Sequence, residues 1–188
     1  MKMTKKILAL TLAVATVVSS AVAPVQKAEA AKSAKITFGI MFAGNGNTCD
    51  WLANPTGSDG CKKVAKTVTV KSGKKTTVTL KVGNVNSVGK KVSVKEATVF
   101  CIDALNAQKS FKKCKFSNIV VKCDGKKVSG LKFKQGSFES NMIKSKYNWR
   151  ASMFNKWGRN GDDTAKNGTA KKYKFKKNMT VTFTFVGK

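Results

Sequence analysis

Apolar and polar residues alternate with a period of two in several stretches of this 188-residue chain. That period is typical of β-strands with one buried face, because successive side chains point to opposite sides of a strand. The clearest case is 179–185, in which apolar residues alternate with threonine, and 77–82 and 68–70 follow the same rule. Two further apolar stretches, 36–42 and 119–122, complete the set of strands that this pattern predicts.

The stretch 97–105 has a different pattern, because it is apolar on both faces except at Thr98 and Asp103. A continuous apolar run of this length is consistent with a strand that is buried on both sides. We therefore expect a central strand here.

Turn signals separate these stretches. Glycine followed by two lysines occurs at 73–75, 89–91 and 125–127, at a spacing too irregular for a true repeat. Asp124 precedes the third glycine, and Asp-Gly after a strand-like stretch is a strong signal for a two-residue β-hairpin turn. Short strands with such turns predict an all-β fold, an antiparallel β-sandwich or jelly roll, in a single domain that spans residues 31–188.

Residues 1–30 have the layout of a signal peptide. A basic start at 1–6 precedes an apolar run at 7–18, and the segment ends in Ala28-Glu29-Ala30, an A-x-A cleavage pattern. The apolar run is too short for a comfortable membrane span, although an uncleaved anchor is the alternative. We expect cleavage after Ala30, no membrane-spanning segment further on, and a secreted, extracellular protein that its charge can hold at the cell surface.

The excess of positive charge indicates that the partner is negatively charged. The chain has 37 Lys+Arg against 9 Asp+Glu, and removal of 1–30 takes away four lysines and one glutamate and leaves a net charge of +25. Such a field attracts acidic cell-wall polymers, anionic glycans, nucleic acid or anionic membranes. Only Arg150 and Arg159 are arginine, whereas lysine is a solvated point charge that lacks the bidentate fork. The lysine-rich surface is therefore expected to attract anions by its density of positive charge more than to recognise one specific anion geometry.

Five cysteines follow residue 30, and in an exported protein disulfides are expected, with one thiol left over. Cys49 and Cys61 bracket an eleven-residue loop and form one candidate pair. Cys114 and Cys123 bracket eight residues and form the other, provided that their strands are adjacent. Cys101 is the expected odd thiol, buried as a small hydrophobic side chain. Other pairings, or five reduced thiols in an anaerobic producer, are the alternatives.

Composition argues against catalysis and against bound metal. The chain has no histidine and no Cys-x-x-C, which leaves no Ser-His or Cys-His machinery and no common zinc pattern. The carboxylates are isolated, without the paired arrangement of a glycoside hydrolase. Asp50 and Asp59 offer oxygens for a structural calcium ion, but so few acidic residues do not support one. We expect a noncatalytic protein without a cofactor.

Aromatic residues beside Asn, Arg and Asp are the feature most typical of ligand binding. Trp51 lies in the loop between Cys49 and Cys61, and segment 146–163 contains both arginines and two of the three tryptophans. An exposed ring is a flat platform for the C–H face of a pyranose, whose hydroxyls bond to nearby polar groups. The alternative is that these rings belong to the core, above all Trp149. The predicted ligand-binding residues are Trp51, Tyr147, Arg150, Asn155, Trp157 and Asn160.

The order of these elements is also informative. In sequence they are a strand that leads into the Trp-bearing loop (41–51), a Val-Phe-Cys-Ile-Asp strand (99–103), a strand with an Asp-Gly-Lys hairpin (119–127), the segment 149–158, and a final Val-Thr-Phe-Thr-Phe strand. This layout resembles the jelly-roll carbohydrate-binding modules of secreted proteins of gut clostridia, and 149–158 is similar to their Arg-x-x-x-(Tyr/Phe)-Asn-x-(Tyr/Trp)-Gly pattern. The resemblance implies a noncatalytic glycan-binding β-sandwich with Arg150, Asn155 and Trp157 as contacts.

We therefore expect a secreted, noncatalytic protein that binds a carbohydrate or cell-wall polymer through aromatic platforms and a lysine-rich surface. The alternative is a structural or adhesion protein that charge alone anchors at the cell surface, and that binds polyanions without recognising a glycan. Two other classes have less support. A membrane-active toxin would need a basic amphipathic helix, and nucleic-acid recognition usually relies on more arginine.

Overall fold

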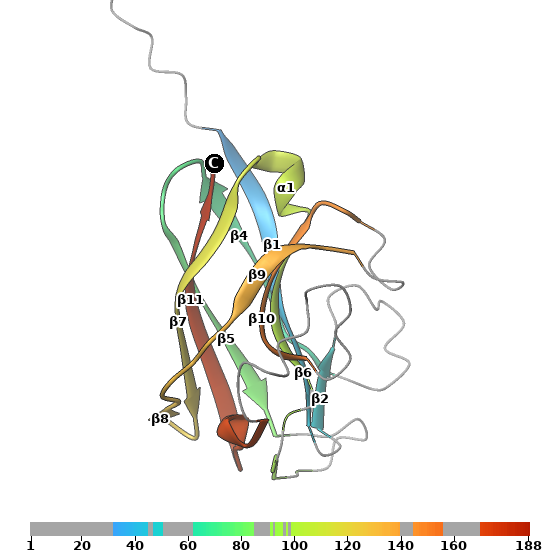
Figure 1. Ribbon diagram of the computed structural model, residues 1–188, viewed down its shortest axis with the longest axis vertical. Coiled ribbons are helices and arrows are strands. Elements are labelled where there is room, and N and C mark those ends of the chain that lie inside the picture. Colours follow the sequence, from blue (N-terminus) through green and yellow to red (C-terminus); the bar gives the residue numbers. More distant parts are fainter. Residues whose placement is uncertain are drawn as a thin grey trace, which may run out of the picture. The chain divides into compact units, whose positions relative to one another are not determined.

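The structure is a computed structural model, and it describes residues 32–44, 47–50, 62–84, 91, 93–95, 97, 99–139, 145–155 and 170–188. Nearly all regular structure in these ranges is β-strand, arranged in two sheets (Figure 1). The helical elements among them are α1 (Ala107–Ser110) and the 3-10 helix η2 (Ala170–Tyr173). No helix in the described ranges is long and apolar enough to cross a membrane. The prediction of an all-β fold is confirmed.

The first sheet has seven strands, with the long strand β1 (Ser33–Gly44) in the middle. Its order is β3 (Lys62–Lys63), β2 (Asn47–Asp50), β1, β6 (Val99–Leu105), β10 (Asn148–Asn155) and β9 (Lys134–Phe138), and β4 (Ala65–Lys71) also pairs with β1. All of its pairs are antiparallel except the short β2–β3 pair.

The second sheet has four strands and is antiparallel throughout. Its order is β5 (Thr76–Gly83), β11 (Asn178–Gly187), β7 (Cys114–Cys123) and β8 (Lys126–Lys127). β11 therefore lies between β5 and β7, although it comes last among these strands in the sequence.

The two sheets pack on a shared core, as in a sandwich. On β1 the alternate residues of 36–42 are buried, and they belong to one cluster with buried residues of the second sheet. Phe38 of β1 packs edge-on against Phe116, Phe183 and Phe185, with ring centroids 5.0–6.2 Å away. Edge-to-face pairs add about 0.5–1.5 kcal/mol each beyond the area that they bury. This aromatic group therefore holds the sheets face to face.

The predicted strands are found where the alternation placed them. The five stretches lie within β1, β4, β5, β7 and β11, and β5 alternates between exposed and buried residues along its length. The stretch 97–105 contains β6, which pairs with both β1 and β10 and is buried at six of its seven positions. The prediction of a central strand is confirmed.

The Asp-Gly hairpin is also confirmed. Asp124 and Gly125 join β7 to β8, with Cys123 paired to Lys126. Both turn residues have positive φ, 50° and 83°, which is what a type I′ turn requires and what Asp-Gly tolerates. The turn at Gly73 joins two strands of different sheets, β4 and β5, and so it carries the chain from one layer to the other.

The pairing of Cys114 with Cys123 is wrong. The two residues are the first and last of one strand, β7, and both are free thiols. Nine steps of extended chain separate them by about 30 Å, whereas a disulfide joins Cα atoms about 4.4–6.8 Å apart. Cys101 is buried, as the odd thiol was expected to be. Cys61 lies outside the described residues, so its pairing with Cys49 stays a prediction.

Candidate anion-binding groove

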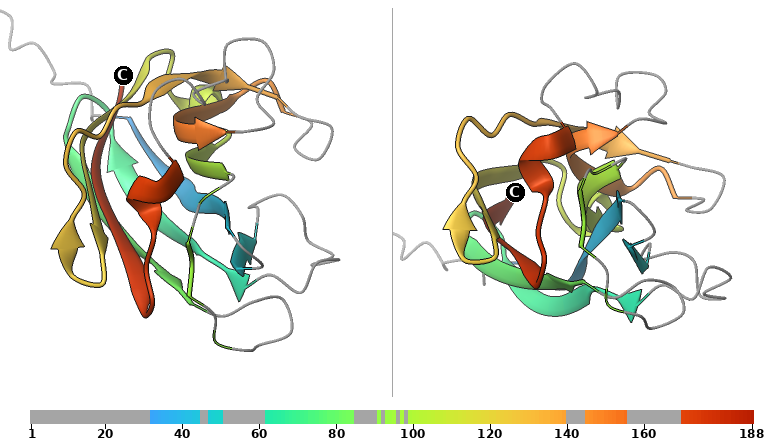
Figure 2. Two further views of the ribbon diagram at one scale, coloured as in Figure 1. Left: turned by 60° about the horizontal axis from the view of Figure 1, so that its bottom comes forward. Right: turned by 90° about the horizontal axis from the view of Figure 1, so that it is seen from below.

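A groove lies at the end of the sandwich that carries the β7–β8 hairpin, and Figure 2 brings this end forward. Three segments surround it: residues 93–95, the hairpin with the residues just after it, and the segment from η2 to the start of β11. Val94 and Phe175 join the first segment to the third, because each N–H donates to the other's carbonyl (2.8 and 3.1 Å). The groove has a volume of about 900 Å³.

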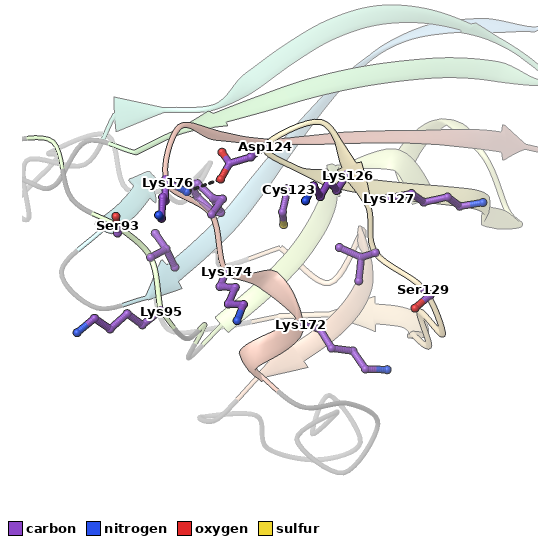
Figure 3. Close-up of a pocket in the computed structure, with 13 residues that line it drawn as sticks. Ser93, Lys95, Cys123, Asp124, Lys126, Lys127, Ser129, Lys172, Lys174 and Lys176 are labelled. Carbon is purple, nitrogen blue, oxygen red and sulfur yellow. Dashed lines mark hydrogen bonds between the residues drawn. The ribbon is translucent and has the colours of Figure 1, made fainter.

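Lysine dominates the lining of the groove. Six of its residues are lysines, all exposed, from all three segments (Figure 3): Lys95, Lys126, Lys127, Lys172, Lys174 and Lys176. The apolar lining has no exposed ring, because Phe175 is only 2% exposed. Among the described residues, none of these lysines forms an ion pair. The groove is therefore a concave surface with a high density of uncompensated positive charge.

Among the described residues of the lining, Asp124 is the one carboxylate, and backbone groups already bind it. Its two oxygens accept hydrogen bonds from the N–H groups of Lys176 (2.7 Å), Lys177 (2.7 Å) and Asn178 (3.1 Å). Burial raises the pKa of Asp124, but these three hydrogen bonds and the charge of Lys177 outweigh it and hold the pKa below its usual value. Asp124 therefore stays ionised and fixes the backbone that carries the groove lysines.

Other contacts hold the walls of the groove in place. The Asn84 side chain donates to the carbonyl of Lys176, and Lys172 Nζ donates to the carbonyl of Gly130 (3.3 Å). Burial raises the pKa of the Cys123 thiol to about 11, with a smaller contribution from the charge of Asp124. Burial likewise raises the pKa of Tyr173, to about 12. Both groups stay neutral at physiological pH, so lysine and Asp124 set the electric field in the groove.

Two of the predicted ligand contacts are buried on β10. Arg150 is 5% exposed, and its guanidinium donates to both oxygens of Asp103 on β6, Nε to Oδ1 (2.6 Å) and Nη2 to Oδ2 (2.8 Å). It also lies 3.7 Å from the centroid of the Phe138 ring. Asn155 is buried as well. These contacts describe a structural anchor between two strands, and a role of Arg150 and Asn155 in ligand binding stays a prediction.

The aromatic candidates are only partly described. Tyr147 is exposed at the turn before β10, far along the domain from the groove, and Lys146 and Lys109 lie beside its ring. Trp149 is half-buried against the core, and its Nε1 donates to Gln135 (3.2 Å), in line with the core alternative. The remaining candidates, Trp51, Trp157 and Asn160, lie outside the described residues.

The sequence reasoning missed the groove lysines. A signal was present in 171–177, where lysine alternates with aromatic residues: Tyr173 and Phe175 are buried, and Lys172, Lys174 and Lys176 are exposed. That alternation predicts a row of cations on one face of an extended segment. The pattern could not show that 93–95 and 126–127 would lie around the same groove, because this depends on how the strands pair.

Comparison of the chain with protein families, with curated proteins and with solved structures finds no match. Within the described ranges no three His, Cys, Asp or Glu side chains gather in a way that could hold a metal ion, and Asp59 lies outside these ranges.

Proposed function

We propose that this chain is an exported, noncatalytic protein that binds an acidic polysaccharide or an acidic cell-wall polymer outside the cell. Residues 1–30 act as its signal peptide, and the all-β domain is of the jelly-roll type that its sequence layout resembles. The observation that carries the proposal is the groove with six exposed lysines, whose one carboxylate is already hydrogen-bonded.

The energetics favour a polymer over a small anion. An exposed ion pair contributes about 0.2–1 kcal/mol, so six pairs together give about 4 kcal/mol, equivalent to a Kd of about 1 mM. A single phosphate or carboxylate reaches few of the lysines and therefore binds still more weakly. A polyanion engages them all and presents its charges many times along its length, which raises the apparent affinity.

The choice of lysine fits the same class of partner. An ammonium group accepts anions from many directions, whereas a guanidinium selects planar, bidentate partners. A lysine groove therefore suits a chain whose anionic groups vary in orientation. Aromatic platforms would add selectivity for sugar rings, and Tyr147 is the described residue that is exposed enough to be one.

The test compares two variants with the same loss of charge. In the groove variant Lys126, Lys172, Lys174 and Lys176 become glutamine. In the matched control, four exposed lysines outside the groove lining become glutamine: Lys35, Lys66, Lys71 and Lys115. Binding to acidic polysaccharides and purified cell walls is measured at about 50 mM and about 500 mM salt, a range over which the screening length falls severalfold. We expect the groove variant to bind at least about tenfold more weakly at low salt, and the control less than about threefold.

A second candidate is a structural or adhesion protein that charge alone anchors at the surface. The spread of lysine favours it, because exposed lysines such as Lys66, Lys71 and Lys81 also lie on strands away from the groove. On this alternative the two variants lose binding equally, every polyanion binds at low salt, and none binds at high salt. That result would replace the groove proposal with charge anchoring.

A further inference from the structure

A second cationic feature lies at the turn that precedes β10. Tyr147 is 39% exposed, and it is the exposed large hydrophobic side chain among the described residues. The Nζ atoms of Lys146 and Lys109 lie 5.5 and 5.8 Å from its ring centroid, within the range of cation–π contact. Both ammonium groups lie over the ring. A sugar whose C–H face stacks on the ring displaces the ammonium group over that face, and the displaced group can then pair with a carboxylate on the same sugar.

Hydrogen bonds hold this turn in a fixed conformation. The Ser145 hydroxyl donates to Asn106 Oδ1 (2.8 Å), and the N–H of Tyr147 donates to the Ser145 hydroxyl (3.3 Å). The buried Asn148 side chain donates to the carbonyl of Ser145 (2.6 Å) and accepts from the N–H of Asn106 (3.0 Å). The carbonyl of Tyr147 accepts from the N–H of Gln108 in α1 (2.9 Å). A turn whose backbone is held in this way loses little backbone entropy when a ligand binds to it.

The Tyr147 turn and the groove lie at opposite ends of the domain. The turn is hydrogen-bonded to α1, which ends shortly before Cys114, the first residue of β7. The groove contains Cys123, the last residue of the same strand. The length of β7 separates these two ends by about 30 Å, and Figure 1 shows α1 and β8 at opposite ends of the sandwich. No single short ligand can occupy both places.

We propose that Tyr147, Lys109 and Lys146 form a second binding site, for a carboxylated sugar ring of the uronic acid class. With the groove at the other end, one molecule then joins two segments of acidic polysaccharide. This inference rests on the proposed function for the groove, and it adds a second site and a cross-linking activity.

Glu139 lies close to this turn, because the residue before it, Phe138, pairs with Asn148, the residue after Tyr147. It forms no ion pair among the described residues. Its charge opposes the ligand, so Glu139→Gln strengthens this site.

The first measurement is the number of galacturonic acid trimers that bind to the purified protein at low salt in calcium-free buffer, determined by NMR titration at millimolar and higher trimer concentrations, because an oligomer that pairs with few lysines binds with a Kd in the millimolar range or weaker. We expect two trimers per molecule for the natural chain, and one for Tyr147→Ala and for the groove variant. Tyr147→Phe keeps the ring and its cations, so it retains two. Lys109→Gln with Lys146→Gln weakens the second site by at least about fivefold, because two ionic contacts are lost. Two trimers bound to Tyr147→Ala would overturn the second site.

The second measurement is light scattering of long polygalacturonate as protein is added. We expect the natural chain and Tyr147→Phe to cluster the polymer, whereas Tyr147→Ala and the groove variant bind it without clustering. Clustering by Tyr147→Ala, or its absence with the natural chain despite binding, would overturn the cross-linking inference and leave the groove proposal intact. No binding of polygalacturonate by the natural chain would overturn this inference, and the pull-down on other acidic polymers would then decide the groove proposal.

Discussion

Replacement of Arg150 is expected to lower the stability of the fold, and it is not expected to remove a direct contact with the ligand. The guanidinium makes a bidentate hydrogen-bonded ion pair with Asp103, and both side chains are buried. Arg150→Met leaves the Asp103 carboxylate in a buried site without this partner, which typically costs about 3–5 kcal/mol. For a domain of this size about 1 kcal/mol corresponds to about 2–4 °C, so the melting temperature should fall by about 6–20 °C.

A double-mutant cycle separates the loss of the pair from the cost of an isolated charge. Replacement of both partners, Asp103→Leu with Arg150→Met, removes the two charges together and is often nearly neutral in buried pairs. We therefore expect the double variant to be more stable than Arg150→Met alone, in urea unfolding monitored by circular dichroism. Lys115→Met, at an exposed position, serves as the control.

Two results would refute this reasoning. A fall of less than about 2 °C for Arg150→Met would mean that the pair contributes little to stability. A loss of polymer binding at unchanged stability would make Arg150 a ligand contact, as its position in the 149–158 pattern suggested.

Three further predictions concern the turn, the second sheet and the thiols. Asp124→Asn should lower the melting temperature at neutral pH, because the pKa of Asp124 is depressed in the folded state and its ionised form therefore stabilises the fold. The difference in melting temperature should shrink as the pH falls below the unfolded pKa of about 3.9, and a difference that does not shrink there would contradict this. Gly187→Ala places a Cβ 2.5 Å from the Phe111 ring and should destabilise by about 1–3 kcal/mol in chemical denaturation, whereas Gly83→Ala, with open space, should cost little. Burial raises the pKa values of Cys114 and Cys123 to about 11, so both thiols should react slowly with iodoacetamide at pH 8 in the native protein. In urea both should react fast without any reductant. If they react in urea only after a reductant is added, they form a disulfide, which would contradict this prediction.

The apolar pattern predicted β1, β4, β5, β6, β7 and β11, but it did not predict β10 (Asn148–Asn155), and it did not show which strands are neighbours. The period of two shows which face of the sheet each side chain occupies. It gives no information about which strand lies next in the sheet. β4 and β5 show the limit: they are consecutive and joined by a tight turn, yet they belong to different sheets. The pairing of Cys114 with Cys123 failed for the same reason, because β7 runs straight through the eight residues that separate them.

The candidate sites also show that local sequence signals do not predict which distant segments lie together. Tyr147 was predicted as a ligand contact because an aromatic residue beside basic and amide residues is a local signal, and the structure shows that its side chain is exposed. The groove was not recognised, since its lysines come from 93–95, 126–127 and 172–176, and only the paired strands bring these segments together. Residue types led to the hypothesis of an acidic polymer as ligand, whereas the position of the groove depends on long-range pairing.

The position of β11 has a consequence for how the chain reaches its folded state. It pairs with β5 and β7 on its two sides, and Thr76 is paired with Phe185 across more than a hundred residues of sequence. The second sheet therefore cannot form before residues 178–187 have been synthesised, and pairing at such separations is slow. The strands β5 and β7 are thus not joined in one sheet until β11 is in place. Loss of β11 would leave β5 and β7 as open edges, which pair readily with other chains and aggregate.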